Sequence, residues 1–352
     1  MEPVLEYTVR DDRPRIIKQK DEIMTIGTHK AFTRTDVRLI DQEIVTIDIS
    51  ELSMCSEIEE IDLGINQIEH IDLSSLASCP VLQRISLSSN SLQRVDLTPL
   101  ISCTLLQSIE LDGNLLTSID LAPISSCTRL RDLTLGHNCL RIVDLTPLTP
   151  CHDLKELRLH SNQLESIDLS PLRGRVGLRS LNLGANKLRS IDLDPLSNCT
   201  DLFSLDLESN LLQNIDLGPL SSCRSLESLS LRMNQLQHID LSPLSSCKEL
   251  SSLHLRNNQL ETIDLSPLSG HAGLWQLSLG SNRLQDIDLE PLSGCKRLYS
   301  LGLESNRLRR VDLGPLSFCK ELHSLRLGDN QLEDIDLSPL DSCPRLERPD
   351  LD

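Results

Sequence analysis

Apolar and polar positions follow a pattern 24 residues long, which recurs about thirteen times along the chain. One copy is "LQHIDLSPLSSCKELSSLHLRNNQ", from Leu236 to Gln259. An aspartate marks every copy, and successive markers are always 24 residues apart, at Asp48, Asp72, Asp96, Asp120, Asp144, Asp168, Asp192, Asp216, Asp240, Asp264, Asp288, Asp312 and Asp336. A fixed period of this length predicts a stack of similar coils.

Each copy contains the pattern L-x-x-L-x-L-x-x-N-x-L, which predicts one short β-strand. The last two leucines of L-x-x-L-x-L alternate with polar residues, so both point to the same side of the strand. A strand this short cannot bury its apolar side alone, but stacking on its neighbours builds a continuous core. With strands about 4.8 Å apart, the coils would extend over roughly 60 Å. We therefore expect one elongated domain, although a length of 352 residues is otherwise typical of two or three domains.

The repeated motif, for example "LWQLSLGSNRL" from Leu274 to Leu284, resembles that of leucine-rich-repeat proteins. The resemblance covers roughly residues 34 to 351. It implies an α/β-type repeat solenoid, a horseshoe or arc, with a parallel sheet on the concave face and short turns, 3₁₀ or short helices on the convex face.

We expect three parts along the chain: an N-terminal cap over residues 1–33, repeats over 34–345, and a partial repeat or cap over 346–352. The N-terminal part contains "VLEYTV", and the C-terminal part begins a further strand and then reaches Pro349. Because proline suits the edge of a sheet, this end could be a natural cap. It could equally be the cut end of a longer chain, or a dimer contact.

Two of the recurring columns predict buried structural residues. An asparagine follows each strand except the first, where Gln42 stands in its place, and its amide can bond an N–H and a C=O that the strand leaves unpaired; the ladder includes Asn210, Asn234, Asn258, Asn282 and Asn306. Cysteine fills eleven of thirteen copies of its column, with Arg175 and His271 as exceptions. The 24-residue spacing is unlike that of a zinc clip, so we expect small buried thiols. Cys139 lies outside the column and is expected to be accessible.

The proline and aspartate columns predict the turn that follows. Proline stands three residues after the aspartate in eleven copies, and in nine of them Ser, Thr, Gly or Asp precedes it. This order predicts an N-cap residue followed by proline at the start of a short helical turn. The aspartate is expected to accept the N–H two residues on, as an Asx turn. Weak cation binding between stacked aspartates is the alternative, because like charges about 5 Å apart repel by roughly 1 kcal/mol even in water.

Function is then expected at the variable positions around the strands. Exposed aromatic residues beside arginines are typical of protein contacts, although the rings could also simply pack over neighbouring leucines. Arg232, His254 and Arg256 are expected to form a basic cluster next to the acidic Asp206 and Glu208. The candidate partner-binding residues on the concave face are Phe203, Asp206, Glu208, Arg232, His254, Arg256, Trp275, Tyr299, His323 and Arg326.

Composition narrows the class of partner. The chain has 52 acidic and 34 basic residues, a net charge of −18, which disfavours nucleic acid and anionic membranes. No segment approaches the roughly 20 apolar residues of a membrane span. The charged N-terminus does not resemble a signal peptide. Together with the twelve cysteines, this favours a reducing, cytoplasmic location.

No catalytic, metal or cofactor site is expected. The sequence has no P-loop and no GxGxxG, and His160 and His254 would lie roughly 20 Å apart by strand spacing. We expect a non-catalytic protein–protein interaction module that binds a protein partner on the concave face, with a monomer favoured. The alternatives are a regulator or inhibitor subunit of a cytosolic enzyme, of the phosphatase- or nuclease-regulator kind, and a structural scaffold.

Overall fold

The structure is a computed structural model that describes residues 15–18, 24–27, 35–347, 349 and 351. It divides into two compact units, Met1–Pro171 and Leu172–Asp352. The strands are β1 (Arg15–Lys18), β2 (Met24–Gly27), β3 (Asp36–Arg38), β4 (Ile47–Asp48), β5 (Glu60–Asp62), β6 (Arg84–Ser86), β7 (Ser108–Glu110), β8 (Asp132–Thr134), β9 (Glu156–Arg158), β10 (Ser180–Asn182), β11 (Ser204–Asp206), β12 (Ser228–Ser230), β13 (Ser252–His254), β14 (Gln276–Ser278), β15 (Ser300–Gly302) and β16 (Ser324–Arg326).

Every helix among these residues is a 3₁₀ turn of three to five residues. The turns are η1 (Ser50–Met54), η2 (Ser74–Ser78), η3 (Thr98–Ser102), η4 (Ala122–Ser126), η5 (Thr146–Leu148), η6 (Ser170–Leu172), η7 (Asp194–Leu196), η8 (Gly218–Ser222), η9 (Ser242–Ser246), η10 (Ser266–Leu268), η11 (Glu290–Gly294), η12 (Gly314–Phe318) and η13 (Ser338–Ser342).

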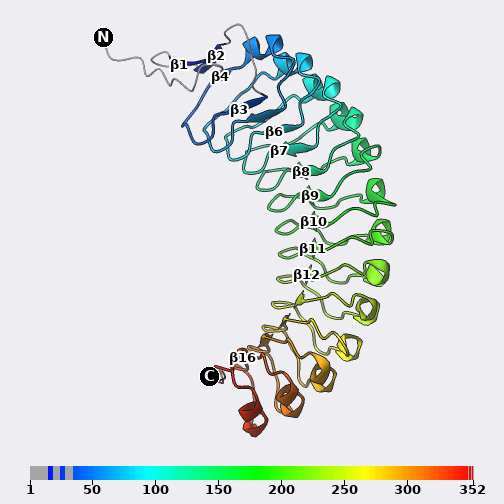
Figure 1. The fold of residues 1–352 in the computed structure, drawn as a ribbon. Helices are drawn as coiled ribbons and strands as arrows, with labels where there is room; N and C mark the ends of the chain where they lie inside the picture. Colours follow the sequence, from blue (N-terminus) through cyan, green and yellow to red (C-terminus); the bar gives the residue numbers. More distant parts are fainter. Residues whose placement is uncertain (1–14, 19–23, 28–34, 348, 350, 352) are drawn as a thin grey trace, which may run out of the picture. The chain divides into compact units, whose positions relative to one another are not determined.

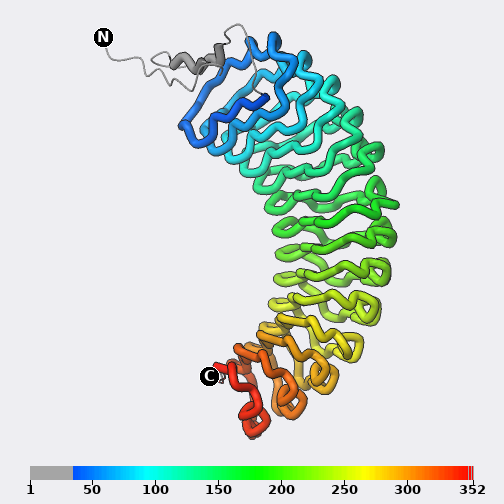
Figure 2. Tube along the Cα trace, in the orientation of Figure 1, coloured from blue at the N-terminus to red at the C-terminus, as the bar shows by residue number. Residues whose placement is uncertain are grey.

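The strands of each unit form an open parallel sheet in chain order. In the first unit β3 is followed by β5, β6, β7, β8 and β9, and in the second the order runs from β10 to β16. The register advances by one repeat, so Leu229 pairs with Leu253 and Leu253 with Leu277. Within each unit the strands line one side and the 3₁₀ turns the other (Figure 1), and successive coils stack directly on one another (Figure 2). The predicted repeat solenoid is confirmed.

The core lies between the sheet and the turns. The central residue of each strand is buried, as are the leucine of each turn and the cysteine that follows it. In the coil of β13, for example, Leu253, Leu255, Leu268 and the neighbouring Cys247 are all fully buried. The low aromatic content follows from this, because stacked leucines fill the core without large rings.

The asparagine amides join neighbouring coils, as the sequence suggested. In Asn234, Nδ2 donates to the carbonyls of Leu207 (2.9 Å) and Leu231 (3.1 Å). Its Oδ1 accepts the N–H of Leu212 at 3.1 Å. The amide therefore satisfies backbone groups of two successive coils in a site that water does not reach.

The aspartates cap the turns, and here one prediction is wrong. Asp240 Oδ1 accepts the Ser242 N–H at 2.8 Å, and all thirteen marker aspartates make the equivalent bond. The Ser, Thr, Gly or Asp before proline is not the N-cap. The preceding leucine, such as Leu241, holds that position without a side-chain cap, because the aspartate already accepts the exposed N–H.

The cysteines of the column are buried and not joined in disulfides. Cys247 Sγ lies 3.4 Å from the Leu220 carbonyl in the preceding coil, and burial raises the pKa of the Cys247 thiol to about 11. His271 occupies the same slot with no exposure, and its Nε2 lies 3.1 Å from the equivalent carbonyl of Leu244. Arg175 is also buried. Of the twelve cysteines only Cys139 is partly exposed.

His271 should make stability depend on pH. Burial, and then Lys248, lower the pKa of His271. The imidazole therefore gains a proton near pH 6.5 in the unfolded chain but only at a lower pH in the folded chain. Stability is therefore highest above about pH 6.5 and falls as the pH drops toward the folded-state pKa, by on the order of 1 kcal/mol per pH unit. We expect His271→Cys, which restores the column residue, to lose less stability between about pH 7.5 and 5.5 in urea titrations. An equal loss in both proteins would contradict this.

Ile65 stands in an unfavourable backbone conformation. Its φ is +56°, and the equivalent positions of other copies carry residues such as Ser89 and Gly113. A β-branched residue is strained in this left-handed region, and Ile65 is 56% exposed, so it recovers little by burial. We expect Ile65→Gly to raise the free energy of unfolding by about 1 kcal/mol. Gly113→Ala, at φ +67°, should lower the free energy of unfolding. If urea unfolding shows that Ile65→Gly lowers this free energy and Gly113→Ala raises it, the assignment of strain is refuted.

The two ends of the described chain extend the stack. β1 pairs antiparallel with β2, and β2 pairs in parallel with β4 of the first coil. At the other end the Glu347 N–H donates to the His323 carbonyl at 3.0 Å. "VLEYTV" lies outside the described residues, and the boundaries of the cap, repeats and C-terminal part stay predictions.

Candidate partner-binding face

The sheet of the second unit presents one continuous surface. The middle leucine of each strand points into the core, while the first and third residues are more exposed, as in β11 and β13. We call the surface formed by β10 to β16 and their flanking residues the strand face. All ten predicted candidates lie on it, within or directly beside β11 to β16.

Three of the four predicted aromatic candidates form a row of rings in contact, which we call the aromatic strip; Trp275 and Tyr299 are stacked, and His323 is tilted by 59° to Tyr299. The rings of Trp275 and Tyr299 are parallel with centroids 4.4 Å apart, and the His323 ring follows at 4.8 Å from Tyr299. Backbone bonds hold the three residues in step, from Tyr299 N–H to the Trp275 carbonyl and from His323 N–H to the Tyr299 carbonyl. Trp275 is 42% exposed. The rings therefore pack on one another and leave apolar surface open to solvent.

Phe203 shares the column of the strip but not its contacts. Glu227 and Ser251 occupy the two coils between Phe203 and Trp275. The ring is 47% exposed, and among the described residues no other ring stacks on it. The shared column was readable from the sequence, whereas the separation of Phe203 from the strip follows from the two polar residues between them.

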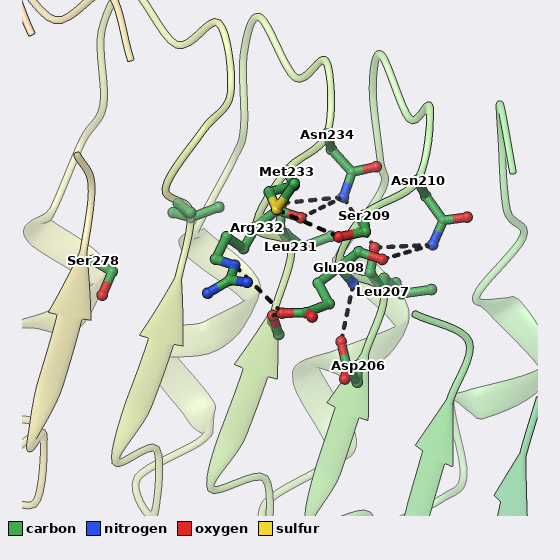
Figure 3. A network of polar contacts seen from close by, with 12 residues as sticks. Asp206, Leu207, Glu208, Ser209, Asn210, Leu231, Arg232, Met233, Asn234 and Ser278 are labelled. Atoms are coloured by element: carbon green, nitrogen blue, oxygen red, sulfur yellow. Dashed lines mark hydrogen bonds and ion pairs between the residues drawn. The ribbon is translucent and has the colours of Figure 1, made fainter. Parts of the chain in front are cut away.

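The acidic and basic candidates interact across neighbouring strands. Arg232 Nε lies 3.5 Å from Glu208 Oε2, and the two side chains point toward each other across β11 and β12 (Figure 3). Asp206 Oδ1 accepts the Glu208 N–H at 3.0 Å. Burial raises the pKa of Asp206, and this hydrogen bond and Arg232 oppose the rise.

His254 does not belong to a basic cluster at neutral pH. Burial, and then the Arg232 guanidinium, lower the pKa of the His254 imidazole below its usual range. The ring is therefore neutral near pH 7. The predicted cluster reduces to the two arginines, because a sequence does not show how deeply a histidine sits between its neighbours.

Arg256 has a partner that the sequence reading missed. Its Nη1 lies 2.8 Å from Glu304 Oε1, two coils away. The Glu304 side chain can lie flat there because Gly280 has no Cβ; a Cβ at that position would approach Glu304 Cδ to 2.5 Å. Glu304 Oε2 is buried without a hydrogen-bond partner among the described residues. The glycines at 280 and 302 were the available signal, because a side chain at either would crowd the carboxylate.

Within the described part of the chain, no group of three or more histidine, cysteine, aspartate or glutamate side chains could hold a metal ion. None of the helices described has both the length and the apolar character required to cross a bilayer.

Sequence comparison identifies the repeats. The family described as leucine rich repeat matches residues 56–116, 104–164, 152–212 and 224–284, more than half of the chain. The chain belongs to the leucine-rich-repeat family. The resemblance noted in the sequence is thereby confirmed. No curated protein sequence matches this leucine-rich-repeat protein.

Solved structures share its fold. The functional domain of InlJ from Listeria monocytogenes, described as including a cysteine ladder, matches with a TM-score of 0.72 at 24% identity, over 90% of this chain and 62% of that one. An internalin from the same species, InlF, matches with a TM-score of 0.67 at 27% identity, over 82% of this chain and 86% of that one. The ectodomain of the plant receptor kinase GASSHO1/SCHENGEN3 from Arabidopsis thaliana, in complex with CASPARIAN STRIP INTEGRITY FACTOR 2, gives 0.60 at 22% identity, over 90% and 46%. This leucine-rich-repeat protein thus spans less than two thirds of the InlJ and plant chains.

Proposed function

We propose that the protein is a non-catalytic module that binds a protein partner on the strand face of the second unit. The observation that carries this proposal is the aromatic strip, a partly exposed row of rings in which Trp275 and Tyr299 are stacked. Tyrosine, tryptophan and arginine contribute most of the binding energy in protein interfaces. Because Trp275 and Tyr299 already stack, little side-chain freedom would be lost on binding.

The charges beside the strip favour a partner of mixed charge. Glu208 and Glu304 are each paired with an arginine of the same face, so both signs are held in fixed positions. Complementary placement of such charges selects the partner and its orientation more than it adds affinity. The complex of the plant ectodomain with its factor shows one leucine-rich-repeat protein with a bound ligand, in line with this role.

We further propose that the protein works in the cytoplasm as a monomer. None of the twelve cysteines is joined in a disulfide, and a compartment that keeps thiols reduced suits such a column. A regulator or inhibitor subunit of a cytosolic enzyme would be a special case of this binding role, and would capture a single enzyme in fixed stoichiometry.

The test is cross-linking mass spectrometry in lysate with wild-type protein and the Trp275→Ala/Tyr299→Ala variant. If each of the two side chains contributes about 2 kcal/mol of binding free energy, their removal should reduce the yield of specific cross-links about 100-fold or more. Phe318→Ala is the matched control, because Phe318 is 59% exposed on the turn η12, on the opposite side. Undiminished cross-linking by the strip variant, or an equal loss with Phe318→Ala, would overturn the proposal and leave the scaffold role.

A further inference from the structure

A depression of about 710 Å³ opens beside β10 and β11, around the ring of Phe203. Three carboxylate residues, Asp201, Glu227 and Glu249, line it together with Arg179 and three serines. The serines are small, so Phe203 is the one large apolar group at this site. The depression therefore combines an aromatic surface with an excess of negative charge.

The backbone fixes the ring beside one of these carboxylates. The Phe203 N–H donates to the Arg179 carbonyl at 2.8 Å, and the Glu227 N–H donates to the Phe203 carbonyl at 2.9 Å. These three residues thus occupy one column on successive coils, about 4.8 Å apart. Asp201 precedes Phe203 by two residues, and Glu249 has the equivalent place two coils later. Arg179 therefore precedes Phe203 in this column, and the carboxylate residue Glu227 follows it on the next coil.

Neither the ring nor the carboxylates are engaged within the described chain. The ion pairs found in the second unit join Arg232 to Glu208, Arg256 to Glu304, Arg345 to Glu321 and His323 to Glu347. None of them involves the three carboxylates of the depression. The ring contacts in this unit belong to the aromatic strip, so the face of Phe203 is free to receive a ligand group.

We propose that this depression binds an arginine side chain of the partner, with the guanidinium stacked on Phe203 and hydrogen-bonded to the surrounding carboxylates. A cation over an aromatic face is attracted by the electron density of the ring. Arginine fits better than lysine because its planar group stacks on a ring and donates to carboxylates at its edge. The inference deepens the proposed binding function and rests on it: it specifies one residue that the partner presents.

The test measures anisotropy of a fluorescein-labelled peptide with three arginines separated by Gly-Ser, and of its lysine twin, at about 0.15 M salt so that long-range attraction is screened. Phe203→Leu keeps apolar bulk and total charge but removes the ring. We expect Phe203→Leu to lower the affinity for the arginine peptide about threefold to fivefold. We expect the wild-type protein to bind the lysine twin more weakly than the arginine peptide. Phe318→Leu, on the opposite side, should change nothing.

A second pair of variants separates local from overall charge. Glu227→Gln/Glu249→Gln should weaken the arginine peptide about fivefold to tenfold. Glu261→Gln/Asp286→Asn removes the same charge from exposed positions of the second unit outside the depression, and should weaken it less than twofold.

Three results would overturn this assignment: no binding of the arginine peptide, equal binding of both peptides, or equal weakening by the two charge-removing variants. If the strip variant loses its cross-links while Phe203→Leu binds the peptide unchanged, the proposed function stands and only the arginine site falls. If Phe203→Leu weakens the peptide but the strip variant keeps its cross-links, the site stands and the strip is not the anchor.

Discussion

Asn210→Ala is expected to lower the free energy of unfolding by about 3 kcal/mol. Asn210 is 4% exposed, and its Nδ2 donates to the carbonyls of Leu183 (3.0 Å), Leu207 (3.2 Å) and Glu208 (3.1 Å). Its Oδ1 accepts the Leu188 N–H at 3.0 Å. Alanine would leave the buried Leu188 N–H unpaired, and such a buried orphan costs about 1–3 kcal/mol. It would also remove one hydrogen bond from each of the three carbonyls, which keep the bonds donated by Asn186, Asn234 and the Ala185 N–H.

Urea unfolding followed by circular dichroism measures this effect. Asn214→Ala is the matched control, because Asn214 is an exposed asparagine of the same coil, and surface substitutions usually change stability by less than about 0.5 kcal/mol. Equal stability of the Asn210→Ala and Asn214→Ala proteins would show that the ladder does not hold the coils together.

The cysteine column should react far more slowly than Cys139 toward iodoacetamide. Burial raises the pKa of Cys223 to about 12 and that of Cys199 to about 11, and only the thiolate is nucleophilic. At about pH 8 a pKa of 11 leaves roughly one thiolate in a thousand. Because these sulfurs are also closed to the reagent, we expect a rate at least about 1000-fold below that of the partly exposed Cys139.

Peptide mass spectrometry before and after addition of denaturant distinguishes the thiols. In the folded protein Cys139 should be modified first. Cys55 and Cys343 should follow more slowly, because each is 5% exposed. All twelve should react once the chain is unfolded. Rapid modification of Cys223 in the folded protein would mean that the column is not part of the core.

The 24-residue period predicted most of the fold, because each coil repeats the same pattern of apolar and turn-forming residues. The alternation of leucines placed Leu229 and Leu253 in the core, and the spacing from Asp240 to Ser242 predicted the Asx bond of the turn. In these cases the interacting groups are a few residues apart in sequence or one full repeat apart.

Features that depend on geometry beyond one period were not predictable in the same way. Ser242 was expected to be the N-cap residue, but its own N–H donates to Asp240, and Leu241 holds the N-cap position. The neutral state of His254 depends on burial. The reach of Arg256 to Glu304 depends on the missing Cβ of Gly280. On the candidate site, the sequence indicated which residues share a face but not which of them touch.

The fixed columns hold the coils together, and we propose that the strand face of the second unit meets the partner. Hydroxyl-radical footprinting of the partner complex tests it most directly, because aromatic side chains are labelled according to their exposure. We expect the partner to protect Trp275 and Tyr299, while Phe318, exposed on η12, remains as reactive as in the free protein. Protection of Phe318 with unchanged labelling of Trp275 and Tyr299 would contradict it.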